Sequence, residues 1–272
     1  MLPFAVAVLL EVRSANLDLA TAAQASPRPR ECRGAATSND GLWSRLRGAD
    51  AQRYCDLMAR GYARLQQSPK EALLAAQAAE VLAGSAPAVR VLSGRAQLRL
   101  GQAAAAFALF QLAEAADARA FADPKALHDY ARAASLAGSS EQALRAYRLL
   151  ASRMALLDDP RERAFCLIEA AAQVLAHVPG GGDEALGYLA QARKQALGLS
   201  AWIDALRALA AQRSEHAEPA SSASPSAGAL GAPPPAGFSD DQPLLPPGLF
   251  EALRARPSRG VAPSPAAKGK PR

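Results

Sequence analysis

The sequence predicts an all-α fold built as a stack of helical hairpins. One residue in four is alanine, which has the highest helix propensity, and aromatic residues make up only 5% of the chain. Strands need β-branched and aromatic side chains to cover a pleated surface, so this composition disfavours a β-sandwich or a barrel. The mean hydropathy of -0.05 and the lack of an apolar run of about 20 residues argue against a helical membrane bundle.

Prolines separate the predicted helices. Twelve of the 20 prolines follow residue 214, and the segment 50–213 contains only five. Each of the five stands where a helix begins or a loop ends, which is where proline is tolerated. They are Pro69, Pro87, Pro124, Pro160 and Pro179. We therefore expect residues 50–213 to form one helical domain.

A sequence pattern repeats within this domain and sets the order of its helices. The pattern Gly-x4-Ala-x3-aromatic begins at Gly101 and recurs at Gly138. Two less complete copies place Ala72 and Ala185 at the position of its alanine. The four copies predict four pairs of helices at 50–66, 69–83, 87–100, 102–117, 124–137, 139–155, 161–177 and 183–197. A ninth helix at 199–213 has the apolar spacing of a capping helix.

Each unit is expected to consist of an A helix and a B helix joined by a tight turn. The turn falls at the glycine of the pattern, or at Gln67 and Ser68 in the first unit. Phe110 and Tyr147 are expected to fill the gap to the next unit. A single hairpin cannot bury its apolar face, so stacking of units supplies a continuous core. The small residues that let the two backbones approach are Gly94, Ala106, Ala131 and Ala143.

These residues resemble the tetratricopeptide repeat family. The likeness covers residues 50–197 and is clearest in 87–120 and 124–157. The first and fourth units depart from the family pattern, because Ala76 and Leu189 stand where an aromatic residue is usual. The resemblance implies a TPR-like α-solenoid whose A helices line a concave groove, and a groove that holds an extended peptide or a partner helix.

The repeat phase places basic residues on the inner face of the predicted groove. Arg95 and Arg132 occupy equivalent positions in neighbouring units. A basic inner surface would bind the carboxylates of an acidic or C-terminal peptide through charge-assisted hydrogen bonds. The sequence supports equally the alternative that these side chains form solvated helix faces. The candidate peptide-binding residues are Arg64, Arg95, Arg99, Lys125, His128 and Arg132.

No set of catalytic, cofactor-binding or metal-binding residues is recognisable. The acidic candidates fall at surface-like helix positions and turns, and His128 is interpreted as a structural or solvated residue. The chain has three histidines and neither a CxxC nor an HExxH motif. A net charge of +6 without interleaved aromatic residues predicts no specific nucleic-acid binding. The acidic residues considered are Glu114, Asp117, Asp158, Asp159 and Glu169.

Residues 1–49 suggest export. An apolar block is followed by Ala23-Gln24-Ala25, which is similar to a signal-peptide cleavage site, although no basic residue precedes Arg13. Residues 1–25 are thus a signal peptide or an N-terminal extension, and 26–49 a linker. We expect a periplasmic or secreted protein, with a cytoplasmic one as the alternative, and the richness in alanine and arginine suggests a bacterial source.

The three cysteines leave two arrangements open. In an exported protein Cys32 and Cys55 could form a disulfide that ties the N-terminal segment to the first helix, with Cys166 the buried odd residue. Three free thiols are the alternative, and we favour it on the sequence.

The tail, residues 214–272, is predicted to be disordered because its Pro/Ala/Ser-rich composition cannot bury enough apolar surface. Residues 244–256 could form a short docking peptide, but we favour a chance apolar cluster. The basic end of the tail would make weak contacts with a membrane surface or an anionic polymer.

The domain as a whole is expected to be a non-enzymatic adaptor or scaffold, and the alternative is a structural spacer or assembly subunit. The sequence does not indicate the oligomeric state.

Overall fold

The computed structural model describes residues 48–84, 86–195, 197–215 and 243–246, together with Cys32, Leu46 and Leu249. These residues form helices and turns, and no strand occurs among them. The α-helices are α2 (Ala49–Arg64), α3 (Pro69–Ala83), α4 (Pro87–Arg99), α5 (Ala103–Ala116), α6 (Pro124–Leu136), α7 (Ser140–Ala151), α8 (Pro160–His177), α9 (Gly182–Gln195) and α10 (Ser200–Glu215). Short 3-10 helices are η2 (Ala118–Phe121), η3 (Met154–Leu156) and η4 (Leu197–Leu199).

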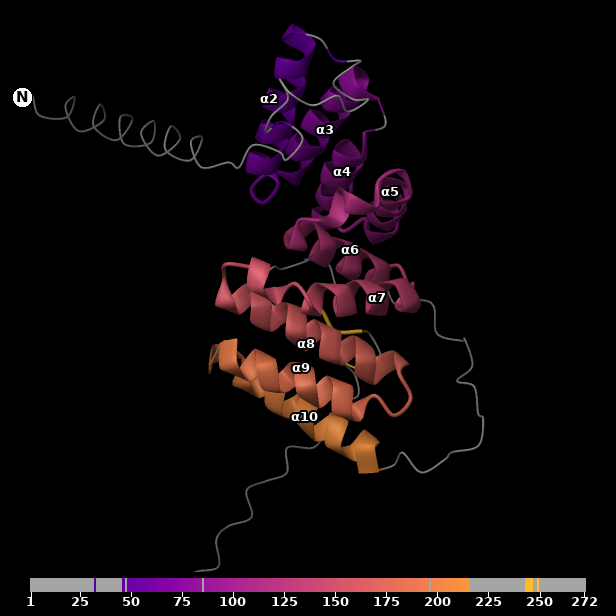
Figure 1. Cartoon of the computed structure of the whole chain (residues 1–272), viewed down its shortest axis with the longest axis vertical. Helices are drawn as coiled ribbons and strands as arrows, with labels where there is room; N and C mark the ends of the chain where they lie inside the picture. Colours follow the sequence, from indigo (N-terminus) through magenta and orange to yellow (C-terminus); the bar gives the residue numbers. More distant parts are fainter. Residues whose placement is uncertain are drawn as a thin grey trace, which may run out of the picture.

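The helices stack in sequence order as an α-solenoid (Figure 1). The hairpins are α2 with α3, α4 with α5, α6 with α7, and α8 with α9. Helix α10 packs on α8 and α9, so the predicted capping helix is confirmed. The predicted helix at 139–155 is too long, because α7 ends at Ala151 and the chain turns through η3 to bury Leu157 before α8 begins.

The four alanines of the repeat occupy equivalent places, as the sequence predicts. Each of Ala72, Ala106, Ala143 and Ala185 is fully buried, with 0% of its surface exposed. In all four, the backbone N–H donates to the carbonyl oxygen of the residue four positions earlier, at the start of the B helix. The units are therefore stacked in register.

Glycine ends the A helices of the second and third units in the same way. Gly101 and Gly138 both have φ of +77°, which is in the left-handed region. The N–H of Gly101 donates to Leu98 at 3.0 Å, and the next N–H along the chain donates to Gln97 at 2.9 Å. The same pair of bonds follows α6, and together they form a Schellman motif.

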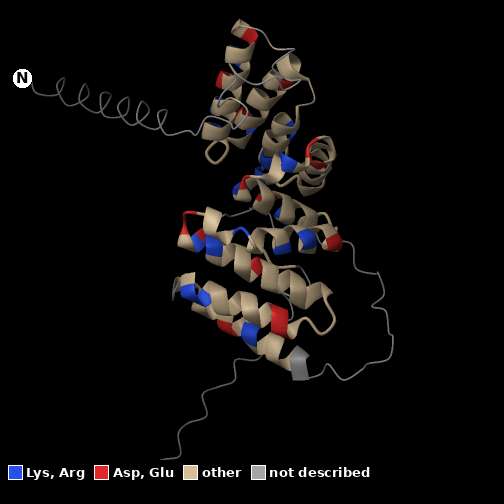
Figure 2. Cartoon of the chain, viewed as in Figure 1, with Lys and Arg blue, Asp and Glu red and all other residues tan. Residues whose placement is uncertain are grey.

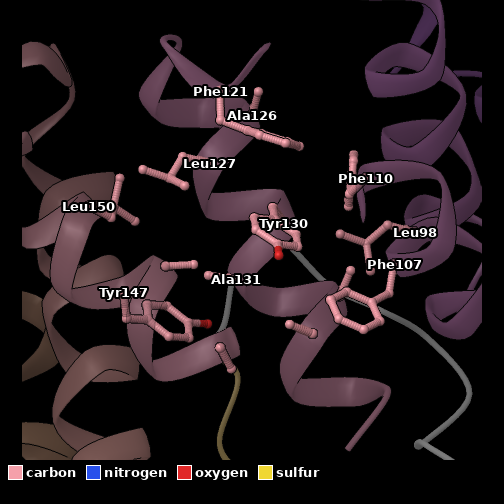
Figure 3. Close-up of a cluster of buried hydrophobic side chains, with 14 of the residues drawn as sticks. Leu98, Phe107, Phe110, Phe121, Ala126, Leu127, Tyr130, Ala131, Tyr147 and Leu150 are labelled. Carbon is pink, nitrogen blue, oxygen red and sulfur yellow. The ribbon is translucent and has the colours of Figure 1, made fainter. Parts of the chain in front are cut away.

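Aromatic side chains fill the space between units (Figure 3). Phe110 of α5 packs edge-on against Phe121 and Tyr130, with ring centroids 5.7 and 5.9 Å apart. A Cβ on Gly94 would stand 2.5 Å from the Phe110 ring, so α4 needs glycine at this close approach. Tyr147 is likewise buried and reaches the next unit through its hydroxyl group.

Cys32 and Cys55 form a disulfide with a Cα–Cα distance of 5.8 Å, so our expectation of three free thiols is wrong. Cys166 is a buried free thiol in α8. The crosslink ties residue 32 to α2.

The predicted signal peptide or extension at 1–25 and most of the linker at 26–49 lie outside the described residues. Most of the tail at 214–272, including its basic end, also lies outside them. Among the described helices, none combines the length and the apolar character that a membrane crossing requires.

Candidate functional site

Five of the six candidate binding residues line one cavity of about 310 Å³. Arg95 and Arg99 reach it from α4, while Lys125, His128 and Arg132 reach it from α6. The sixth candidate, Arg64, does not line it and instead pairs with Glu71 at 3.5 Å on the surface of α2 and α3. The remaining lining residues are Gln66, Asp129, Asp159, Arg161, Glu162 and Phe165.

Asp129 pairs with two of the three arginines of α4, Arg95 and Arg99. Its carboxylate accepts from Arg95 Nε at 2.6 Å and from Arg99 Nη1 at 3.1 Å. Burial by itself would raise the pKa of Asp129, but the two guanidinium groups outweigh burial and lower that pKa to about 2. These ion pairs join α4, the A helix of the second unit, to α6, the A helix of the third unit.

Glu169 has the corresponding role one unit further along the stack. It accepts from Arg132 Nη2 and His128 Nε2, both at 2.6 Å, and from the Tyr147 hydroxyl at 3.0 Å. Burial by itself would raise the pKa of Glu169. The neighbouring charges and hydrogen bonds outweigh burial and lower this pKa, and the charge of Arg132 is the largest of them. Burial and the Glu169 charge raise the pKa of Tyr147, which keeps its hydroxyl a donor.

The sequence interpretation of Glu169 is therefore wrong. We placed it at a surface-like position, yet none of its surface is exposed. A signal was available, since Glu169 follows Arg132 by 37 residues and so continues the phase of Arg95 and Arg132. An acid at that position of the fourth A helix predicts a partner for the arginine of the third.

The predicted basic surface is largely neutralised within the protein. Arg95 and Arg132 are 7% and 3% exposed, so they are neither free for a ligand carboxylate nor part of a solvated face. Lys125 is half-exposed and pairs with Glu162 at 3.2 Å. Arg161 lies over the Phe165 ring and makes no ion pair within the described part of the chain. Basic and acidic residues are interspersed along the stack (Figure 2).

A segment of the tail lies against Glu169. The backbone N–H of Leu244 donates to Glu169 Oε1 at 2.7 Å. Residues 243–246 have no regular secondary structure, and Pro243 and Pro246 are buried. Leu249 is 5% exposed and packs with Leu245 in the apolar cluster that α8, α9 and α10 form. We call these five residues, 243–246 and Leu249, the docked segment.

The docked segment corrects the prediction for the tail. The expectation of disorder does not hold for its five residues, and the less favoured alternative, a docking peptide near 244–256, agrees with their packing. The segment is the short yellow trace beside α8 in Figure 1.

The inner surface thus has two parts. The open part is the cavity between α4, α6 and the start of α8. The covered part is Glu169 with the apolar cluster of α8, α9 and α10, in which the docked segment packs. His128 and Arg132 border both parts, because they line the cavity and also donate to Glu169. We call the two parts together the groove.

One further polar group lies beneath this surface. Gln173, one helical turn beyond Glu169 on α8, donates from Nε2 to Ser135 Oγ. Its Oε1 is buried and accepts no hydrogen bond within the described residues.

Across the same residues, no three His, Cys, Asp or Glu side chains are grouped to hold a metal ion. Searches against protein-family models, curated proteins and solved structures find nothing similar to this chain.

Proposed function

We propose that the protein is a non-enzymatic interaction module, an adaptor or scaffold, that binds an extended peptide segment of a partner protein in the groove. The observation that carries this proposal is the docked segment. Its backbone N–H at Leu244 donates to Glu169 of α8, and its leucine side chains pack in the apolar cluster of α8, α9 and α10. A surface that accepts such a segment from its own chain has the chemistry to accept one from another protein.

The open part of the groove supplies room for a longer ligand. Its cavity of about 310 Å³ borders the covered part at His128 and Arg132. A peptide that began in the covered part would continue past these residues toward Arg161 and Lys125, which are the exposed cations of the rim. An acidic residue at that point of the peptide would meet Arg161, which makes no ion pair within the described residues.

The tetratricopeptide-like character of the domain is part of the same proposal. The in-register alanines, the glycine turns and the aromatic residues between units support it. The buried ion pairs refine what the resemblance implied, because Arg95, Arg99 and Arg132 use their charge to hold neighbouring A helices together. The partner peptide is recognised through its backbone and its apolar side chains, with a contribution from Lys125 and Arg161 at the rim.

Site-specific crosslinking in the native cell tests the proposal. A photoreactive amino acid at Lys125, on the rim of the open part, is expected to give a discrete covalent adduct whose mass spectrum identifies a partner peptide. The matched control carries the same amino acid at Leu74, which is 64% exposed on α3 and outside the groove. Adducts at Leu74 with none at Lys125 would contradict the proposal.

A further inference from the structure

The docked segment uses the hydrogen-bonding capacity that a ligand of the groove would need. An ionised carboxylate offers about four lone-pair sites. Glu169 accepts from His128, Arg132 and Tyr147 inside the domain, and Leu244 takes a further place on Oε1. A second backbone N–H cannot reach Oε1 while Leu244 occupies it.

The apolar surface beside Glu169 is occupied in the same way. Leu249 is almost fully buried in the apolar cluster of α8, α9 and α10, and Leu245 is partly buried against the same cluster. Ile203 and Leu206 of α10 belong to the cluster and are themselves fully buried. A leucine of a partner would need the place that Leu249 fills. The docked segment therefore already makes both contacts that a ligand would make here, the hydrogen bond to Glu169 and the burial of a leucine.

We propose that the docked segment is an intramolecular inhibitor of the groove, and that the partner peptide replaces it with a similar pair of leucine-like side chains and a backbone N–H to Glu169. This inference rests on the proposed function. The partner is therefore a leucine-containing peptide, and its binding requires the docked segment to leave.

Covalent attachment makes a weak contact sufficient for this role. The docked segment is joined to α10 through residues 216–242, and a tethered ligand has an effective concentration on the order of millimolar. If the untethered segment binds with a Kd of about 0.1 mM, the tether reduces the apparent affinity for a competing peptide by about tenfold. A partner that binds more tightly still displaces it.

The test uses the full chain and a synthetic peptide of residues 238–252 labelled with a fluorophore. Binding is measured by fluorescence anisotropy for the wild type and for Leu245→Ala with Leu249→Ala, which releases the segment. The control is Leu74→Ala with Leu112→Ala, the same chemical change at exposed leucines of α3 and α5. The released variant is expected to bind at least tenfold more tightly than the wild type and the control.

Three results overturn the inference, and they separate it from the proposed function. Equal affinity of the wild type and the released variant overturns the inference and leaves peptide binding intact. Weaker binding by the released variant overturns it as well, provided that its circular dichroism matches the wild type. Absence of binding to all three chains overturns the inference and the proposed function together. The single change Leu245→Ala, at a half-buried side chain, is expected to shift affinity in the same direction by a smaller factor.

Discussion

The open and covered parts of the groove are built on the same kind of ion pair but differ in what lies over it. In both, an arginine of one A helix is paired with a carboxylate of the next, Arg95 with Asp129 and Arg132 with Glu169. The open part has exposed cations at its rim and a solvent cavity. The covered part holds main chain through a single backbone hydrogen bond and buried leucine.

The difference separates two roles for charge in this surface. The buried ion pairs join successive units, because each one spans two A helices. The docked segment contacts Glu169 through a backbone N–H. Its leucine side chains pack in the apolar cluster and make no use of charge. The comparison teaches that basic residues on the inner face of a solenoid do not by themselves indicate an acidic ligand.

The largest expected effect comes from removing Arg132. Arg132→Ala leaves Glu169 buried without its principal partner, and breaking a buried pair in this way costs about 3 to 5 kcal/mol. Urea unfolding of the full chain measures the loss. The control is Arg145→Ala, whose bridge to Glu114 is exposed and contributes about 1 kcal/mol or less. Equal losses in the two variants would break the distinction between buried and exposed charge.

Acid should lower the free energy of unfolding, because Asp129 takes up a proton and loses its ion pairs with Arg95 and Arg99. A carboxyl group whose pKa is lowered by folding stabilises the protein above its unfolded pKa, and this stability is lost as the pH falls through the folded value. With a folded pKa of about 2, the loss begins near pH 5 and reaches about 2 kcal/mol at pH 2.

The free energy of unfolding at pH 7 and at pH 2.5 measures the contribution of Asp129. Asp129→Asn is expected to be less stable than the wild type at pH 7, and the gap between the two should narrow at pH 2.5. A gap that stays constant with pH would show that the charge of Asp129 does not stabilise the fold.

The smallest expected effect on stability belongs to Arg161, at the exposed rim. Arg161→Ala should change the free energy of unfolding by about 0.5 kcal/mol or less, because substitutions at exposed sites away from buried networks have small effects. The same variant should bind an acidic peptide several-fold more weakly at low salt, and this difference should fade as salt increases. A large loss of stability would place Arg161 with the buried arginines instead.

The sequence predicts the fold well because local signals and the repeat agree. Proline at the first turn, glycine at the ends of α4 and α6, and alanine at each contact fix where the helices begin, turn and touch. The phase of the repeat also brings five candidate residues to one cavity.

The pairing of charges and the docked segment depend on contacts between distant parts of the chain. Glu169 is an acid within an alanine-rich helix, and its burial follows from Arg132 and His128 on the preceding unit. Leu244 lies 75 residues from Glu169 in the sequence, and a short apolar stretch in a Pro-rich tail carries no local sign of the surface it contacts.

Hydrogen exchange at the backbone amide of Leu244 tests the central claim most directly, since that N–H is the contact between the docked segment and the groove. In the full chain at neutral pH, we expect this amide to exchange at least about tenfold more slowly than the intrinsic rate for its sequence. Leu245→Ala with Leu249→Ala should remove the protection. Exchange at the intrinsic rate in the wild type would contradict the account.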